Sequence, residues 1–112
     1  MRVLGIDVET TVQKAEKGLD NSPFNPENYL VSCGIHWLGE ETGEYYFFKH
    51  NTAECDPQAS YKAVQQAISE ADILVGHNLK YDLLWLSETG FDIDCAYYCT
   101  MIGEYVLARG QK

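Results

Sequence analysis

The four-residue run ILVG at positions 73–76 constrains the fold more than any other part of the sequence. It is too short for a helix and too apolar for a loop, which predicts a central strand sandwiched on both faces. The stretch HNLKYDLLWLSETG at 77–90 follows directly, with leucines at helical spacing and Gly90 at the C-terminal cap position. The sequence therefore predicts a strand–turn–helix unit in a sheet covered by helices.

The other expected elements complete a mixed sheet of α/β class. An apolar run predicts the first strand, and aromatic or β-branched runs predict two antiparallel strands after it. Asp56 and Pro57 supply an N-cap and first residue for an amphipathic helix that reaches Ala71. The expected ranges are a strand at 2–8, a long ordered loop at 10–28, strands at 29–38 and 44–50, and a final short strand followed by a helix from about Thr100.

Charge limits the kinds of partner that the chain can bind. Eight Lys and Arg against 17 Asp and Glu give a formal net charge of −9, which disfavours a module that tracks many phosphates. An enzyme that holds only the last nucleotides of a strand through divalent cations needs little positive charge of its own. No apolar run is long enough for a membrane helix or a signal peptide, so we expect a cytoplasmic protein with no membrane partner.

The four cysteines do not form a recognisable metal or redox motif. Cys33, Cys55, Cys95 and Cys99 include no CxxC pair, and no second ligand pair with zinc spacing accompanies Cys95 and Cys99. We expect buried, reduced thiols. We likewise interpret His36, His50 and the aromatic run at 45–48 as sheet packing rather than as a metal site or a base-stacking platform.

Two carboxylates stand at the end of the first expected strand. Asp7 and Glu9 are two residues apart, so their side chains project from the same face, while Ile6 and Val8 face the other way. Like charges placed side by side are costly unless a cation neutralises them, and no Lys or Arg lies nearby in sequence. A divalent metal explains the pair economically, although a solvated strand end with two unrelated acids remains open.

Asp82 strengthens the metal interpretation. It lies in an otherwise apolar helix, four residues after Asn78, so that a carboxamide and a carboxylate share one helix face. The helix follows directly from a buried strand, which places its first turns beside the sheet edge where Asp7 and Glu9 emerge. The alternative is that Asn78 is an N-cap and Asp82 a first-turn acid favoured by the helix dipole.

Two segments resemble the motifs of a known family. LGIDVETT (4–11) resembles the first motif, and VGHNLKYDLLWL (75–86) the second motif, of the proofreading 3′–5′ exonuclease superfamily with the ribonuclease-H-like fold. The resemblance is closest to the exonuclease domains of family A, phage-type DNA polymerases. NPENYLVSCGI and CTMIGEYVLARG also resemble the second strand and the helix after the second motif, so the resemblance covers nearly the whole chain.

The resemblance implies metal-dependent hydrolysis of phosphodiesters at the 3′ end of single-stranded DNA. It implies that Asp7, Glu9 and Asp82 are catalytic ligands of two metal ions, and that Thr10 and Asn78 contact the terminal nucleotide. Mg²⁺ or Mn²⁺ fits because these ligands are hard oxygens. It also implies association with a polymerase domain or subunit.

The third motif of the family, Tyr-x3-Asp or His-x4-Asp, is absent. No Asp stands four residues after any tyrosine near the end of the chain, and the only His-x4-Asp is His77 with Asp82. Glu104 is interpreted as a surface helix residue. We therefore expect residues 1–112 to be a partial, C-terminally truncated ribonuclease-H-like domain with little or no activity alone. A non-catalytic nucleic-acid-binding or docking module of the same fold, and a stand-alone RNA exonuclease, remain alternatives.

Overall fold

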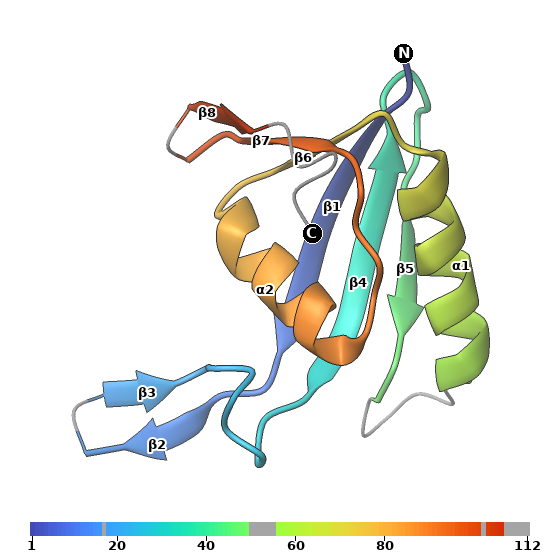
Figure 1. Cartoon of the computed structure of the whole chain (residues 1–112). Coiled ribbons are helices and arrows are strands. Elements are labelled where there is room, and N and C mark those ends of the chain that lie inside the picture. Colours follow the sequence, from blue (N-terminus) through green and yellow to red (C-terminus); the bar gives the residue numbers. More distant parts are fainter. Residues whose placement is uncertain (17, 50–55, 102, 107–112) are drawn as a thin grey trace.

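A six-stranded mixed sheet with two helices forms the body of the protein (Figure 1). The computed structural model describes residues 1–16, 18–49, 56–101 and 103–106. The strand order is β5-β4-β1-β6-β7-β8, and β2 and β3 form a separate hairpin. The elements are β1 (Val3–Thr10), β2 (Gln13–Ala15), β3 (Gly18–Asp20), β4 (Leu30–Trp37), β5 (Glu44–Phe47), α1 (Pro57–Glu70), β6 (Ile73–Gly76), α2 (Leu79–Thr89), β7 (Ala96–Cys99) and β8 (Glu104–Val106).

The central strand β1 has two unequal neighbours. It pairs antiparallel with β4 from Leu4 to Thr10, but it pairs parallel with β6 only at Val3, Leu4 and Gly5. The carboxyl half of β1 therefore extends beyond β6 and has a free edge on that side. A Cβ added at Gly76 would lie 2.8 Å from the Ile6 carbonyl oxygen, so glycine is required where the end of β6 approaches β1.

The hydrophobic core lies between the sheet and the two helices, which cover the same face (Figure 1). Leu4 and Leu74 from the sheet are fully buried against Val64 and Leu86 from the helices. The expectation that both faces of β6 are covered is wrong for the described residues. Ile73 and the other outward residues of β6 are only half-buried, because both helices pack on the opposite face.

The helix boundaries agree with the expected caps. The Asp56 side chain accepts a hydrogen bond from the Ala59 backbone N–H at 3.1 Å, and Pro57 is the first residue of α1. Gly90 ends α2 with φ 107°, a left-handed conformation that glycine adopts without steric cost. Both predictions are confirmed.

Two expectations about local structure are wrong. The segment at 10–28, expected to be a long ordered loop, contains the β2–β3 hairpin, which projects from the body of the protein (Figure 1). The helix expected from Thr100 is not formed in the described residues, because Gly103, at φ 62°, turns the chain back and β8 pairs antiparallel with β7. Residues 107–112, His50 and Cys55, on which other expectations fall, lie outside the described residues.

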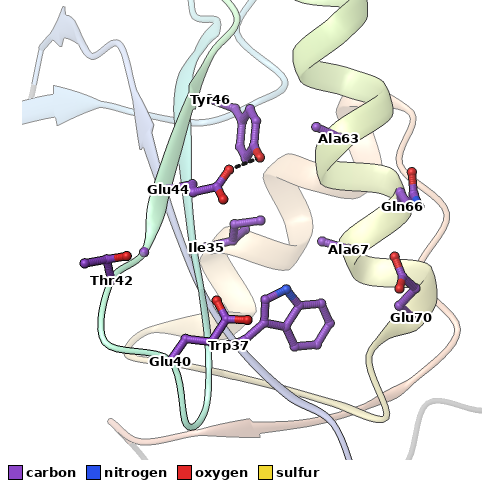
Figure 2. A pocket seen from close by; sticks show the side chains of 11 residues that line it. Ile35, Trp37, Glu40, Thr42, Glu44, Tyr46, Ala63, Gln66, Ala67 and Glu70 are labelled. Atoms are coloured by element: carbon purple, nitrogen blue, oxygen red, sulfur yellow. Dashed lines mark hydrogen bonds between the residues drawn. The ribbon is translucent and has the colours of Figure 1, made fainter.

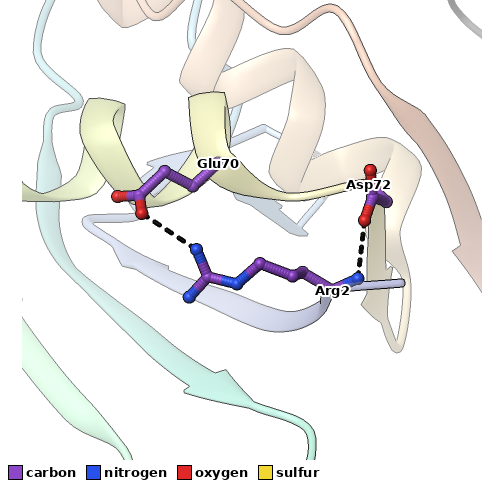
Figure 3. Close-up of polar contacts among 3 residues, drawn as sticks. All are labelled: Arg2, Glu70 and Asp72. Carbon is purple, nitrogen blue, oxygen red and sulfur yellow. Dashed lines mark hydrogen bonds and ion pairs between the residues drawn. The ribbon is translucent and has the colours of Figure 1, made fainter.

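The start of β1 is fastened to the segment between α1 and β6 (Figure 3). The Arg2 backbone N–H donates to Asp72 Oδ2 at 2.6 Å, and the guanidinium donates to Glu70 at 2.9 Å while lying 4.0 Å above the Trp37 ring. The ion pair is about half exposed and adds less than about 1 kcal/mol. Together these contacts join the chain before β1 to the segment that leads into β6, directly before the first parallel pair, Val3 with Ile73.

Candidate functional site

The two carboxylates of β1 lie on the face of the sheet that neither helix covers. Asp7 and Glu9 are both exposed. Ile6, which precedes Asp7, and Val8, which lies between the two acids, are buried on the helix face. The alternation predicted from the sequence is therefore confirmed. It presents two acids side by side on the carboxyl half of β1, next to the free edge of that strand.

Asp82 approaches the same part of β1 from α2. It is 3% exposed, and its carboxylate accepts a hydrogen bond from the Val8 backbone N–H. The even-numbered residues of β1 direct their backbone N–H and C=O groups toward the side of β6. Arg2, just before β1, shows this direction, because its carbonyl oxygen accepts a hydrogen bond from the Asp72 N–H. The Val8 N–H points to the same side, where it is available to Asp82. Since β6 pairs with β1 only as far as Gly5, the Asp82 side chain occupies the position that a strand partner would otherwise take.

The Asp82 carboxyl group lies in an unfavourable environment for a negative charge. The pKa of Asp82 is raised to about 7, chiefly by burial and then by the charge of Asp7, while the hydrogen bond from the Val8 backbone N–H acts in the opposite direction. Its second oxygen, Oδ2, is buried and has no hydrogen-bond partner among the described residues. The negative charges of Asp7 and Asp82 are thus close enough to repel each other, and the Oδ2 atom of Asp82 has no hydrogen-bond donor.

Cys33 lies beneath these acids on β4, where it pairs with Val8. The pKa of its thiol is raised to about 12 by burial, then by the charges of Asp82 and Asp7. The thiol therefore stays protonated and is a packing group rather than a soft metal ligand. Cys33, Cys95 and Cys99 are all buried and form no disulfide, which agrees with the expectation of reduced thiols for the cysteines that the structure describes.

The two residues predicted to contact a nucleotide flank the acids. Thr10 ends β1, and its hydroxyl lies 2.8 Å from the Tyr81 hydroxyl on α2. Asn78 is the N-cap residue of α2 in a left-handed conformation, φ 55° and ψ 41°, and its exposed side chain makes no cap hydrogen bond. Asn78 therefore precedes the helix instead of sharing a helix face with Asp82. Asparagine tolerates this left-handed conformation better than most residues do.

The donor set fits a hard divalent cation, but it is not assembled in this structure. No group of three or more His, Cys, Asp or Glu side chains in the described ranges is arranged so that it could hold a metal ion. A bound cation would nevertheless give the unsatisfied Oδ2 of Asp82 a partner and would neutralise the charge of Asp7 beside it. Carboxylate oxygens are the ligands that Mg²⁺ and Mn²⁺ prefer.

Tyr81 is a site residue that sequence reasoning missed. It links α2 to the end of β1 through Thr10, and it also donates to the Asn21 carbonyl oxygen at 3.4 Å. The available signal was its position, directly before Asp82 in the segment HNLKYD. Cys33 was missed as a neighbour of the acids because nothing in the sequence indicates which β4 residue pairs with Val8.

A separate cavity of about 240 Å³ lies between α1 and the β4–β5 hairpin (Figure 2). Its rim carries Glu40, Glu44 and Glu70, and none of the candidate site residues line it. The expected packing role is confirmed for Tyr46 and Phe48, which pack against the core, whereas His36 and Tyr45 are exposed. A His36 ring nitrogen lies 2.6 Å from the Glu40 carbonyl oxygen, and the Tyr45 ring packs on the backbone of β4.

The comparisons with known proteins point to DNA polymerases. No protein-family model matches the chain. DNA polymerase I of Aquifex aeolicus (strain VF5) is 31% identical over 102 residues, which cover 88% of this chain and 16% of that protein. The chain is thus related in sequence to a segment of a DNA polymerase, and it spans about a sixth of that relative's length.

A solved structure shows the same fold. The family B DNA polymerase from the hyperthermophilic archaeon Pyrobaculum calidifontis matches with a TM-score of 0.58 and 19% identity, over 96% of this chain and 14% of that chain. The match supports the expected ribonuclease-H-like, mixed α/β architecture. Within the described ranges, neither helix has the length and apolar character required to cross a bilayer.

Proposed function

We propose that this chain is part of a 3′–5′ exonuclease domain of a DNA polymerase, which hydrolyses phosphodiesters at DNA 3′ ends. The observation that carries the proposal is the buried, unpaired oxygen of Asp82 beside Asp7, at the free edge of β1. A folded protein rarely retains such an arrangement without a ligand, because burying an unsatisfied carboxylate is costly. The similarity to DNA polymerase I supports the same conclusion.

In this proposal Asp7, Glu9 and Asp82 hold two Mg²⁺ or Mn²⁺ ions. Bound ions of this kind activate a water molecule and stabilise the charge on the attacking and leaving oxygens. Thr10 and Asn78 contact the terminal nucleotide, and Tyr81 fixes the position of Thr10 through the hydrogen bond between their hydroxyl groups. The strand enters at the uncovered face of the sheet, where Asp7 and Glu9 are exposed.

A nuclease assay tests the proposal. With single-stranded DNA labelled at its 3′ end and Mn²⁺ present, we expect slow release of mononucleotides that stops in EDTA and in Glu9→Gln. The rate should be far below that of intact proofreading domains, because this chain lacks the third motif and with it a ligand. Cleavage within the strand, or digestion of 5′-labelled ends, would contradict the assignment. A single-stranded RNA of the same sequence tests the RNA alternative.

A further inference from the structure

A cavity of about 440 Å³ lies between the start of α1 and the last turns of α2, the two helices that cover one face of the sheet (Figure 1). Asp7 and Glu9 project from the opposite face, so the sheet separates the cavity from a strand that these acids hold. A ligand of the cavity therefore reaches it as a free molecule. The volume lies within the range of about 300–1,000 Å³ that is typical of small-molecule sites.

Aromatic side chains form most of the cavity wall. They are Tyr29, Phe48, Tyr61 and Trp85. Tyr61 stacks on Phe91 with ring centroids 4.5 Å apart, and Phe48 meets the Phe91 ring edge-on at 6.0 Å. The Tyr61 hydroxyl and the Trp85 indole N–H each donate to a backbone carbonyl oxygen outside the cavity. These contacts hold the rings in place and satisfy their polar atoms, so the cavity offers a ligand a fixed apolar wall.

Two charged side chains line the cavity, Lys49 after β5 and Glu88 on α2. The Lys49 ammonium group lies 4.4 Å above the Tyr29 ring, which places a positive charge beside the aromatic wall. Both charged side chains are exposed, and in the described part of the chain no ion pair joins them. Lys49 can therefore pair with an anionic group of a ligand, and Glu88 can accept a hydrogen bond from a hydroxyl or amino group.

The cavity lining suits a ligand with a flat ring, a negative charge and a hydrogen-bond donor. Aromatic walls favour a ring that can stack on them, and a lysine beside them favours an anion such as phosphate. A nucleoside monophosphate combines these groups in its base, its phosphate and its sugar hydroxyls. An acidic side chain that accepts a hydrogen bond from a sugar hydroxyl also recurs in nucleotide sites.

We propose that this cavity binds a free nucleoside 5′-monophosphate, with its base against the aromatic wall, its phosphate at Lys49 and its 3′-hydroxyl at Glu88. The inference rests on the proposed exonuclease function, because hydrolysis at a DNA 3′ end releases deoxynucleoside 5′-monophosphates. The released nucleotide has both a free 3′-hydroxyl and a phosphate monoester, a combination that no nucleotide within a longer strand has. The cavity is therefore a product site, separate from the acids, that selects the free nucleotide over the strand.

Calorimetric titration with deoxyadenosine 5′-monophosphate tests the proposal in EDTA, where no metal ion links a phosphate to the acids. We expect binding at one site, and Tyr29→Leu should weaken it roughly tenfold, the value of about one base–aromatic stack. Lys49→Gln should weaken it by about the same factor but leave the affinity for deoxyadenosine, which has no phosphate, unchanged. Lys62→Gln, at an exposed lysine on α1 outside the cavity, is the matched control.

The sugar contact has its own test. The parent chain should bind deoxyadenosine 3′,5′-bisphosphate more weakly than the monophosphate, because the second phosphate replaces the 3′-hydroxyl and is repelled by Glu88. The difference between the two ligands should shrink in Glu88→Gln, which keeps the size of the side chain and removes its charge. An equal difference in the parent chain and in Glu88→Gln would contradict the assignment of the 3′-hydroxyl to Glu88.

The outcomes separate this proposal from the nuclease assignment. Equal affinities of the parent chain, Tyr29→Leu and Lys49→Gln for the monophosphate would overturn the cavity site, as would inorganic phosphate that binds as tightly as the nucleotide. Loss of nucleotide binding in Asp7→Ala would place the nucleotide at the acids and overturn it too. Nucleotide binding at the cavity in a chain that binds no Mn²⁺ would keep the cavity site and overturn the nuclease function. Lys49→Gln is a surface change, so the test does not depend on Tyr29→Leu folding.

Discussion

Replacing Asp7 by alanine should weaken Mn²⁺ binding by more than about 100-fold, because it removes one of the three carboxylates that would hold the ions in the proposed site. Loss of a residue that only orients a metal ligand typically costs 10- to 100-fold, and loss of a ligand costs more. Isothermal titration of the purified chain with Mn²⁺ at pH 8, where Asp82 is ionised, measures the effect.

The control for this substitution is Asp94→Ala. Asp94 is also an exposed acid, but it lines a small cavity beside the end of α1, with Ser69 and Ala71. Its variant should bind Mn²⁺ like the parent chain. Equal affinities in the Asp7 and Asp94 variants would show that Mn²⁺ binds only through general surface charge. If the Asp7→Ala variant instead keeps full affinity for single-stranded DNA and the parent chain binds no Mn²⁺, the non-catalytic binding module is the better account.

In metal-free protein, the free energy of unfolding should fall as the pH rises from about 4 to about 7 and then level off. The pKa of Asp82 is about 7 in the folded chain and about 3.9 when unfolded, so between these values the folded state binds a proton that the unfolded state has released. The stabilisation is therefore present at low pH and lost through this window. A difference of three pKa units corresponds to about 4 kcal/mol, and we expect a loss of about 2–4 kcal/mol.

The variant Asp82→Asn isolates this contribution, because asparagine has a similar shape and no charge. Urea unfolding across the pH range should show a flatter profile, with the variant more stable than the parent chain at pH 8 by about 2 kcal/mol once the cost of burying an amide is included. Saturating Mn²⁺ should restore stability to the parent chain and do less for the variant. Profiles of equal slope for parent and variant would show that Asp82 is not strained in the folded protein.

The elements that form the sheet core could be predicted from the sequence for a physical reason. β1 and β6 are short apolar runs that end in polar residues, and α1 and α2 have leucine or alanine stripes with recognisable caps. The convergence of Asp7 with Asp82 also followed, because a helix that leaves the carboxyl end of β6 must pass the end of the neighbouring strand. In the structure the Asp82 carboxylate accepts a hydrogen bond from the backbone N–H of Val8, the residue after Asp7, and the charge of Asp7 raises the pKa of Asp82.

The remaining features depend on contacts that are distant in sequence or on single turn residues. β2, β3 and β8 each have three residues, which is too short to show periodicity. Gly18 and Gly103, which lie next to the turns of these hairpins, have positive φ. The contact between Thr10 and Tyr81 joins residues 71 apart. The free edge of β1 that Asp82 occupies arises from the register of β6, which no local pattern encodes.

The central claim is that Asp7, Glu9 and Asp82 bind divalent ions at the free edge of β1. A crystal structure of the chain soaked in Mn²⁺, with anomalous diffraction data, tests it most directly. We predict an anomalous peak within about 2.3 Å of carboxylate oxygens of Asp7 and Asp82, with Oδ2 of Asp82 among the ligands. A peak elsewhere, or a fully soaked crystal in which Oδ2 of Asp82 stays buried without a ligand, would contradict the claim.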